Sequence, residues 1–207
     1  MSMELWAVRL DRALTEEEEE LLLALTPPER RRRLVERTRR ELWREPLCAY
    51  GALALALREA FGWKSPPEIA LTPQGKPYFP GRPEAAFSLS HTGGLVLVGL
   101  ATGLTGVDAE KIRPLRRRTM ALLSPSAGTE EEFFRDWVRR EARAKRTGTA
   151  VGAALRREAP PCPEERYQPL DLFPGYAAGA AWAAEEPLGE IRRRTMEEFL
   201  RRLAQKD

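Results

Sequence analysis

The chain has 207 residues, of which 43% are hydrophobic and 31% charged, and its 34 basic and 31 acidic side chains leave a formal net charge of +3. These values are typical of a globular protein with one large or two small domains, and so small an excess of positive charge does not require nucleic acid as a partner. Two cysteines are too few for the disulfide framework of a secreted domain. No apolar run approaches the roughly 20 residues that span a membrane, and the first residues lack the pattern of a signal peptide. We therefore expect a cytoplasmic protein that has no membrane partner.

The first part of the chain predicts one strand followed by three helices. Thr15 is a suitable N-cap for the first helix, and Pro28 fits the first turn of the second, which runs toward Trp43 and ends before Pro46. An Ala- and Leu-rich stretch predicts a third, buried helix that ends at Gly62. We expect the strand and the helices over residues 3–10, 16–25, 28–43 and 47–60.

The middle of the chain predicts short strands separated by turns. Gly75, Lys76 and Pro77 lie in a segment rich in turn residues, and residues 91–94 form a tight turn between two apolar strands. Gly103 then interrupts the pattern before a last strand. We expect these strands over residues 69–71, 87–90, 95–102 and 105–110.

The rest of the chain predicts helices, then strands, then a final helix. An amphipathic pattern with an aromatic stripe predicts a long helix over residues 130–146, and prolines 160, 161 and 163 mark a loop. We expect the other elements over residues 114–123 (helix), 167–173 and 176–184 (strands) and 191–205 (helix). Because residues 1–103 and 104–207 are similar in size and content, this order predicts an α+β protein with two related lobes.

Asp108 and Glu110 stand two residues apart at the end of an apolar strand, so their side chains project from the same face. Two such acids can bind a cation, and oxygen ligands favour Mg²⁺ or Mn²⁺ over zinc. Acids at strand ends also commonly decorate the exposed edge of a sheet. The spacing alone leaves both interpretations open.

His91, the only histidine, follows Ser90 and precedes a turn that contains two glycines. Adjacent residues of an extended segment point to opposite faces, and the chain has no G-x-S-x-G motif, so a Ser-His-Asp hydrolase triad is not expected. The histidine is either a structural residue of the turn or a phosphate ligand that neighbouring backbone N–H groups assist.

Glu141 and Lys145 form an i, i+4 pair on the predicted long helix. Such pairs usually stabilise an exposed helix surface, but this pair lies beside the aromatic stripe. Lys76, Arg30 and Arg33 are further potential phosphate ligands, although arginine runs usually form solvated helix faces. Neither a Walker-type loop nor a G-x-G-x-x-G loop is present.

Four motifs follow one another along the chain. They are a Gly-Lys-Pro turn at residues 75–77, an aromatic-x-Leu-Ser-His segment at residues 87–91, a Gly-Val-Asp-x-Glu strand at residues 106–110, and a Trp-x-x-x-Glu-Ala-x-x-Lys helix at residues 137–145. In this order the motifs resemble those of the 4′-phosphopantetheinyl transferases of the larger, Sfp-like class, and the resemblance spans most of the chain.

The resemblance implies a fold and a reaction. The fold is a pseudo-twofold α+β protein whose two lobes bind coenzyme A in the cleft between them, so that a monomer suffices. The reaction transfers phosphopantetheine from coenzyme A to a serine of an apo acyl or peptidyl carrier protein and releases adenosine 3′,5′-bisphosphate, which is a holo-acyl-carrier-protein synthase activity. The alternative is a non-catalytic member of the family that binds coenzyme A or a carrier as a regulator.

The resemblance also implies roles for individual residues. Asp108, Glu110 and Glu141 would hold Mg²⁺, with Glu141 as the general base and Lys145 neutralising the pyrophosphate. A further set would bind coenzyme A through its 3′-phosphate (Arg30, Arg33 and His91), its adenine (Gly75, Lys76 and Pro77) and its other phosphates (Ser90).

Two features depart from the family pattern. Arg140 replaces the lysine that precedes the helix glutamate, which keeps the charge but changes the geometry. The segment between Glu110 and Trp137, which helps to dock the carrier in the family, is short. The sequence therefore does not indicate which carrier is modified.

Overall fold

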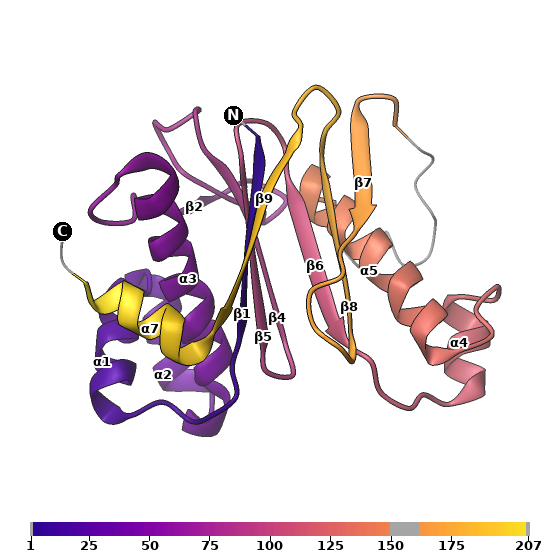
Figure 1. Ribbon diagram of the computed structural model, residues 1–207, viewed down its shortest axis with the longest axis horizontal. Helices are drawn as coiled ribbons and strands as arrows, with labels where there is room; N and C mark the ends of the chain where they lie inside the picture. The colour runs from indigo at the N-terminus through magenta and orange to yellow at the C-terminus, as the bar shows by residue number, and fades with distance from the viewer. Residues whose placement is uncertain (1, 150–161, 206–207) are drawn as a thin grey trace.

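Two stacked β-sheets form the centre of the protein, and this computed structural model describes residues 2–149 and 162–205 (Figure 1). The first sheet has the strand order β4 (Ala86–Thr92), β5 (Leu95–Ala101), β1 (Met3–Arg9) and β9 (Leu188–Thr195). The second sheet has the order β6 (Gly106–Lys111), β8 (Tyr176–Ala183) and β7 (Glu165–Pro169). A separate hairpin consists of β2 (Ala70–Leu71) and β3 (Pro77–Tyr78).

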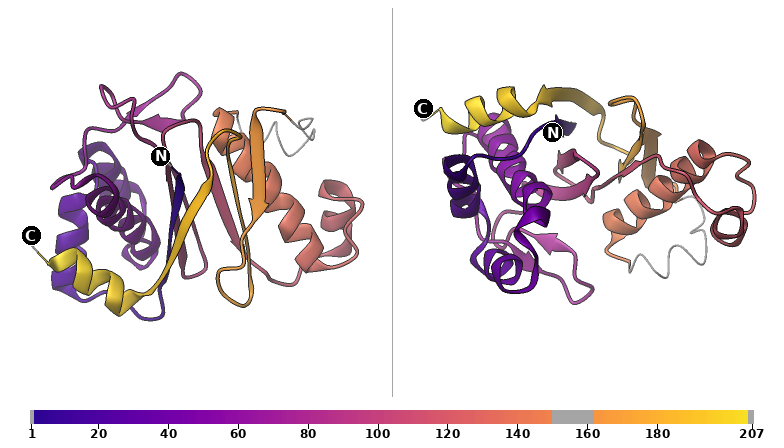
Figure 2. Two further views of the ribbon diagram at one scale, coloured as in Figure 1. Left: turned by 45° about the horizontal axis from the view of Figure 1, so that its top comes forward. Right: turned by 90° about the horizontal axis from the view of Figure 1, so that it is seen from below.

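Helices cover the outer face of each sheet, so the protein has four layers, as Figure 1 and Figure 2 show. The first sheet is covered by α1 (Glu16–Leu25), α2 (Pro28–Arg37), α3 (Arg44–Phe61) and α7 (Met196–Ala204). The second sheet is covered by α5 (Glu130–Thr147), and α4 (Arg117–Leu123) packs against α5. No helix in the described part of the chain is long and apolar enough to cross a membrane.

The side chains of β1 alternate between two cores. Leu5 and Ala7 pack between the two sheets, whereas Trp6 and Val8 pack against the helices of the first sheet. A central strand that is apolar on both faces can be covered on both sides, and this places the first sheet in the interior of the protein.

Several predicted helix boundaries are confirmed. Thr15 caps α1 and accepts a hydrogen bond from the N–H of Glu18, while Glu18 reaches back to the N–H of Thr15. α3 ends at Gly62, whose φ of +68° lies in the left-handed region that favours glycine. The long amphipathic helix is present as α5 and ends one residue later than predicted.

The second predicted helix is too long. α2 ends at Arg37, a short 3₁₀ helix, η1 (Arg40–Leu42), follows, and α3 already begins at Arg44. Pro46 therefore lies inside the first turn of α3. Proline is tolerated there because the N–H that it lacks would have no partner within the helix.

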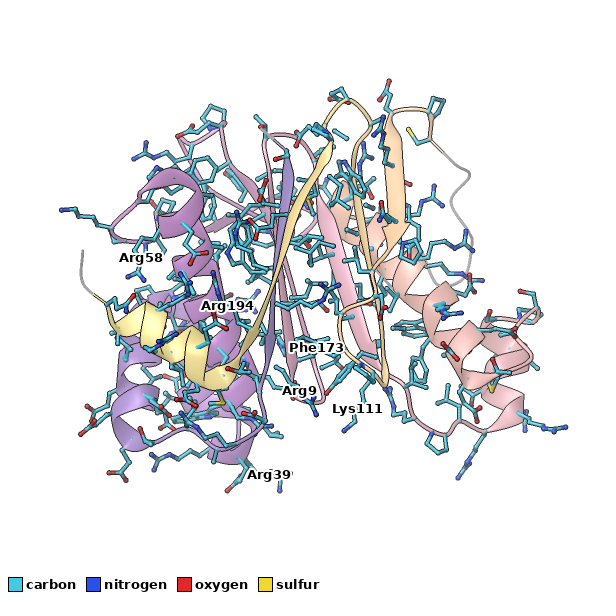
Figure 3. All side chains as sticks on the ribbon, in the orientation of Figure 1. Arg9, Arg39, Arg58, Lys111, Phe173 and Arg194 are labelled. Carbon is cyan, nitrogen blue, oxygen red and sulfur yellow. The ribbon has the colours of Figure 1, made fainter. Side chains whose placement is uncertain are left out.

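The predicted C-terminal helix is wrong over residues 191–195, which belong to β9, and only α7 is helical. β9 runs parallel to β1, with Ile191 opposite Leu5. Arg194, labelled in Figure 3, is buried here and donates to both carboxylate oxygens of Glu59 at 2.9 and 3.0 Å. In a hydrophobicity pattern, an arginine that is buried through an ion pair with a distant residue is counted as a solvent-facing residue. Counted in this way, Arg194 fitted the polar face of a helix.

β9 and α7 return the chain to the first sheet, so the division between the two sheets does not follow the predicted division of the chain at residues 103 and 104. The pseudo-twofold relation between two lobes stays a prediction. Pro160 and Pro161, which were assigned to a loop, lie outside the described residues.

Side-chain hydroxyls join the two sheets where β4 runs beside β6. Ser88, Ser90 and Thr92 accept hydrogen bonds from the N–H groups of every second residue of β6, at 3.0, 3.2 and 3.3 Å. These N–H groups lie on the free edge of β6 and would otherwise be left without partners. The hydroxyls therefore hold β6, with its two acids, against β4.

Candidate active site

Asp108 and Glu110 lie on the face of β6 that looks toward α5, while Val107 points the other way into the core between the sheets. The two acids thus share a face, as the spacing of two residues predicted. α5 approaches this face closely because Gly106 has no side chain: a Cβ at this position would lie 2.0 Å from the carbonyl O of Ala142.

Asp108 is the centre of a hydrogen-bonded cluster to which three elements contribute. Lys145 of α5 donates from Nζ to Asp108 Oδ1 at 2.6 Å and to the carbonyl O of Leu89 in β4 at 3.3 Å. Ser90 of β4 donates its hydroxyl to the same Oδ1 at 2.9 Å. Three of the predicted site residues are therefore in direct contact.

Burial and like charge raise the pKa values of two carboxyls in this cluster. Burial raises the pKa of Asp108, although the charge of Lys145 opposes the effect. Burial, and then the charge of Asp108, raise the pKa of Glu141 to about 7, and the charge of Glu110 acts in the same direction. The three acids are close enough to influence one another, and a carboxyl that titrates near neutral pH is suited to general base catalysis.

The donor set of the cluster fits a hard divalent cation. Asp108 Oδ2 is buried and has no hydrogen-bond partner among the described residues. An unsatisfied buried oxygen lowers the stability of the folded protein unless a cation or a water molecule binds to it. Glu110 and Glu141 add further carboxylate oxygens, the ligands that Mg²⁺ prefers. In the described part of the chain no three acidic, histidine or cysteine side chains enclose an ion by themselves. Magnesium does not need such a cage, because it usually takes one or two carboxylates and completes its shell with water and substrate phosphates.

A pocket of about 560 Å³ lies beside this cluster, between α2, α3, the β2–β3 hairpin, β4 and the end of α5. None of its lining residues in the described chain is acidic. The pocket brings together seven of the predicted site residues, namely Arg30, Arg33, Gly75, Lys76, Pro77, His91 and Lys145. A cavity with several cations and no carboxylate is suited to an anionic ligand that carries more than one phosphate.

Two of the predicted coenzyme A ligands also have other contacts. Lys76 donates from Nζ to the carbonyl O of Thr105 at 2.8 Å and to the carbonyl O of Lys145. Burial, and then the charge of Arg146, lower the pKa of Lys76 to about 8. Its ammonium thus ties the hairpin to the end of α5 and forms part of the pocket wall. Ser90 is buried beside Asp108 and does not line the pocket.

Two contacts of Arg140, which stands where the resemblance predicts a lysine, are with residues other than Asp108, Glu110 and Glu141. Its guanidinium pairs with Asp136 at 2.6 Å and donates to the carbonyl O of Leu123 at 2.8 Å. Because these partners belong to α5 itself and to α4, the replacement of lysine by arginine leaves the bonds around Asp108 intact.

Some residues of the site belong to none of the sequence motifs. Tyr50, Gln74 and Thr149 line the pocket but belong to no motif, and nothing in their local sequence indicates this position. The hydroxyls of Ser88 and Thr92 did have a signal, because small polar residues alternate along β4 and therefore lie on one face.

Comparison with known proteins gives little further information. No protein-family model matches the chain. The chain is similar to two curated relatives named "Uncharacterized protein YieE", from Escherichia coli strain K12 and from Escherichia coli O6:H1 strain CFT073, each 36% identical over 88 residues. The similarity covers 42% of this chain and 34% of each relative, so the chain spans about a third of the length of the relatives that it matches.

Proposed function

We propose that the protein is a Mg²⁺-dependent 4′-phosphopantetheinyl transferase, which moves phosphopantetheine from coenzyme A to a serine of an apo carrier protein. One observation carries the proposal: Lys145 lines the cationic pocket and also donates to Asp108 in the carboxylate cluster at 2.6 Å. A site for anions and a site for a cation therefore meet at one side chain. A diphosphate substrate and its divalent cation require this arrangement.

Coenzyme A would occupy the pocket, whose volume lies within the range of roughly 300–1,000 Å³ that is usual for small-molecule sites. Arg30, Arg33 and His91 would bind its 3′-phosphate. Arg33 forms an ion pair with Glu29, with Nε 3.0 Å from Oε1, whereas Arg30 has no ion pair with any described residue. We therefore expect Arg30 to contribute the larger share of phosphate binding.

Asp108, Glu110 and Glu141 would hold the metal ion, which when bound would neutralise the charge of the pyrophosphate. Ser90 keeps Asp108 Oδ1 oriented through its hydrogen bond of 2.9 Å. Asp108 Oδ2 is thereby the oxygen that is left for a ligand.

Glu141 is the general base of the proposed reaction. It takes the proton of the carrier serine as the serine oxygen forms a bond to the phosphorus of the phosphopantetheine group. The bond from this phosphorus to the bridging oxygen of the pyrophosphate breaks, and adenosine 3′,5′-bisphosphate leaves with the electron pair. Lys145 balances the negative charge that develops on the leaving phosphate.

The carrier protein would approach the chain segment that connects β6 to α5, which carries exposed positive charge. Arg116, Arg117 and Arg118 are exposed and form no ion pair with a described acid. A run of unpaired cations favours an acidic partner over a neutral one.

The proposal is tested with a panel of purified apo carriers from fatty-acid, polyketide and peptide synthesis, each incubated with coenzyme A and Mg²⁺. We expect mass spectrometry to show the added phosphopantetheine group on at least one carrier, with acidic carriers loaded fastest. Binding of coenzyme A without loading of any carrier would instead support a non-catalytic regulator.

A further inference from the structure

We propose that Glu45 is the residue that positions His91 in the pocket, by holding ring nitrogen Nδ1 so that Nε2 is presented to a ligand phosphate. The identity of the phosphate, as the 3′-phosphate of coenzyme A, rests on the proposed function. The role of Glu45 in positioning the His91 ring does not, since the state of the ring can be measured without a ligand.

Glu45 lies in the first turn of α3, and its two carboxylate oxygens have different partners. Oε2 lies 3.4 Å from His91 Nδ1, and Oε1 accepts a hydrogen bond from the N–H of Gly94 at 2.7 Å. One carboxylate therefore connects the helix, the imidazole and the turn between β4 and β5. His91 also lines the pocket.

The turn beside His91 is held from three sides, so it can serve as a fixed support. Gly93 and Gly94 have φ values of +47° and +91°, which only glycine adopts readily in this turn. The carbonyl O of Gly94 accepts from the N–H of Leu10 at 2.7 Å, and the carbonyl O of Gly93 accepts from the hydroxyl of Tyr176 at 2.7 Å. Glu45 supplies the third connection.

The charge state of Glu45 determines what His91 can do. The hydrogen bond with His91, more than any other contact, lowers the pKa of Glu45, and the N–H of Gly94 acts in the same direction. A charged carboxylate can only accept hydrogen bonds, so the nitrogen that faces it must carry a proton. Nδ1 is then the donor to Glu45, and Nε2 is the nitrogen that remains for the ligand. Because phosphate oxygens are acceptors, Nε2 donates to the ligand when the ring carries a proton on both nitrogens.

Glu45→Gln removes this constraint in a defined way. Glutamine has a single acceptor oxygen, and the N–H of Gly94 already lies at bonding distance from this position. The amide NH₂ then faces Nδ1 and requires it to accept. We therefore expect the neutral imidazole to change from the Nδ1–H tautomer in the wild type to the Nε2–H tautomer in the variant.

The first measurement is the long-range ¹H–¹⁵N correlation spectrum of the neutral imidazole in the whole protein. His91 is the only histidine, so its signals need no assignment. Glu41→Gln, at an exposed glutamate of η1, is the matched control and should keep the wild-type tautomer. A wild-type spectrum of the Nε2–H form, or the same tautomer in the wild type and in Glu45→Gln, would overturn the assignment.

The second measurement is calorimetric binding of coenzyme A and of 3′-dephospho-coenzyme A. Glu45→Gln should weaken the binding of coenzyme A about tenfold, because an amide NH₂ facing Nδ1 disfavours the doubly protonated ring that makes a charge-assisted hydrogen bond to the 3′-phosphate. The binding of the dephospho form should be unchanged. Equal weakening for both ligands would show that Glu45 only supports the local structure, against the proposed role. Absence of coenzyme A binding in the wild type would refute the proposed function, while the tautomer result would still decide the position of His91.

Discussion

Glu141→Gln is expected to lower the rate of phosphopantetheine transfer about a thousandfold and to stabilise the magnesium-free protein by about 2 kcal/mol at pH 8. In the proposed reaction the rate falls because an amide cannot accept the serine proton, and general base catalysis contributes roughly 10²–10⁴-fold. The stability rises because the wild-type carboxylate is charged at this pH while it is largely buried beside Asp108.

The direction of the stability change follows from the pKa of Glu141, which is about 7 in the folded protein against 4.5 for a glutamate side chain exposed to water. Between these pH values the folded protein keeps a proton that the unfolded chain has lost. Stability therefore falls as pH rises through this window, and the full cost is present above pH 7. Partial exposure of the side chain to solvent reduces that cost, which is why we expect about 2 kcal/mol and not the larger value that the pKa difference alone would give.

Urea denaturation at pH 5 and pH 8 without magnesium measures this effect. The advantage of Glu141→Gln should be small at pH 5 and present at pH 8. Glu131→Gln, an exposed substitution in the first turn of the same helix, serves as the control and should change stability by less than about 0.5 kcal/mol at either pH. If Glu141→Gln is less stable than the wild type at pH 8, Glu141 does not lie where the structure places it.

Gly106→Ala is expected to destabilise the protein by about 3 kcal/mol and to abolish transfer. The added Cβ would lie 2.0 Å from the carbonyl O of Ala142 and 2.3 Å from the backbone N of Arg146. Both atoms belong to the backbone of α5, so no side chain can rotate away to make room. β6 and α5 must move apart, and the lysine and glutamate of α5 then lose their contact with Asp108.

Thermal denaturation and a transfer assay on the folded fraction test this prediction together. Gly128→Ala is the matched control, because its Cβ would lie 3.4 Å from a flexible side-chain atom of Glu132 and should fit with little cost. Unchanged stability in Gly106→Ala would contradict the close contact of β6 with α5.

Local sequence patterns predicted those parts of the site that depend on a single element. The spacing of two residues places Asp108 and Glu110 on one face of a strand, and the spacing of four residues places Glu141 and Lys145 on one face of a helix. The ammonium of Lys145 bonds Asp108 and not Glu141. These patterns contain no information on whether the helix lies against the strand. That contact depends on Gly106, whose lack of a side chain lets α5 approach β6. The need for a glycine at this position is evident only when the position of α5 is known.

Side chains that act across the fold could not be assigned in this way. The ammonium of Lys76 bonds the carbonyl O of Lys145, 69 residues away, and so forms part of the pocket wall. Glu45 meets His91 only because α3 begins beside the β4–β5 turn. The strand β9 was missed for the same reason, since its buried Arg194 is explained by a partner in α3 and not by its neighbours in the chain.

The central claim is that the carboxylates of β6 and α5 act on coenzyme A bound in the adjacent pocket. The most direct test is the mass of an apo carrier after incubation with coenzyme A and three preparations: wild type with Mg²⁺, wild type with a chelator, and Asp108→Ala with Mg²⁺. We predict the added phosphopantetheine group in the first preparation alone, with coenzyme A still bound by Asp108→Ala. Loading by Asp108→Ala at the wild-type rate, or loading that persists in the chelator, would contradict this claim.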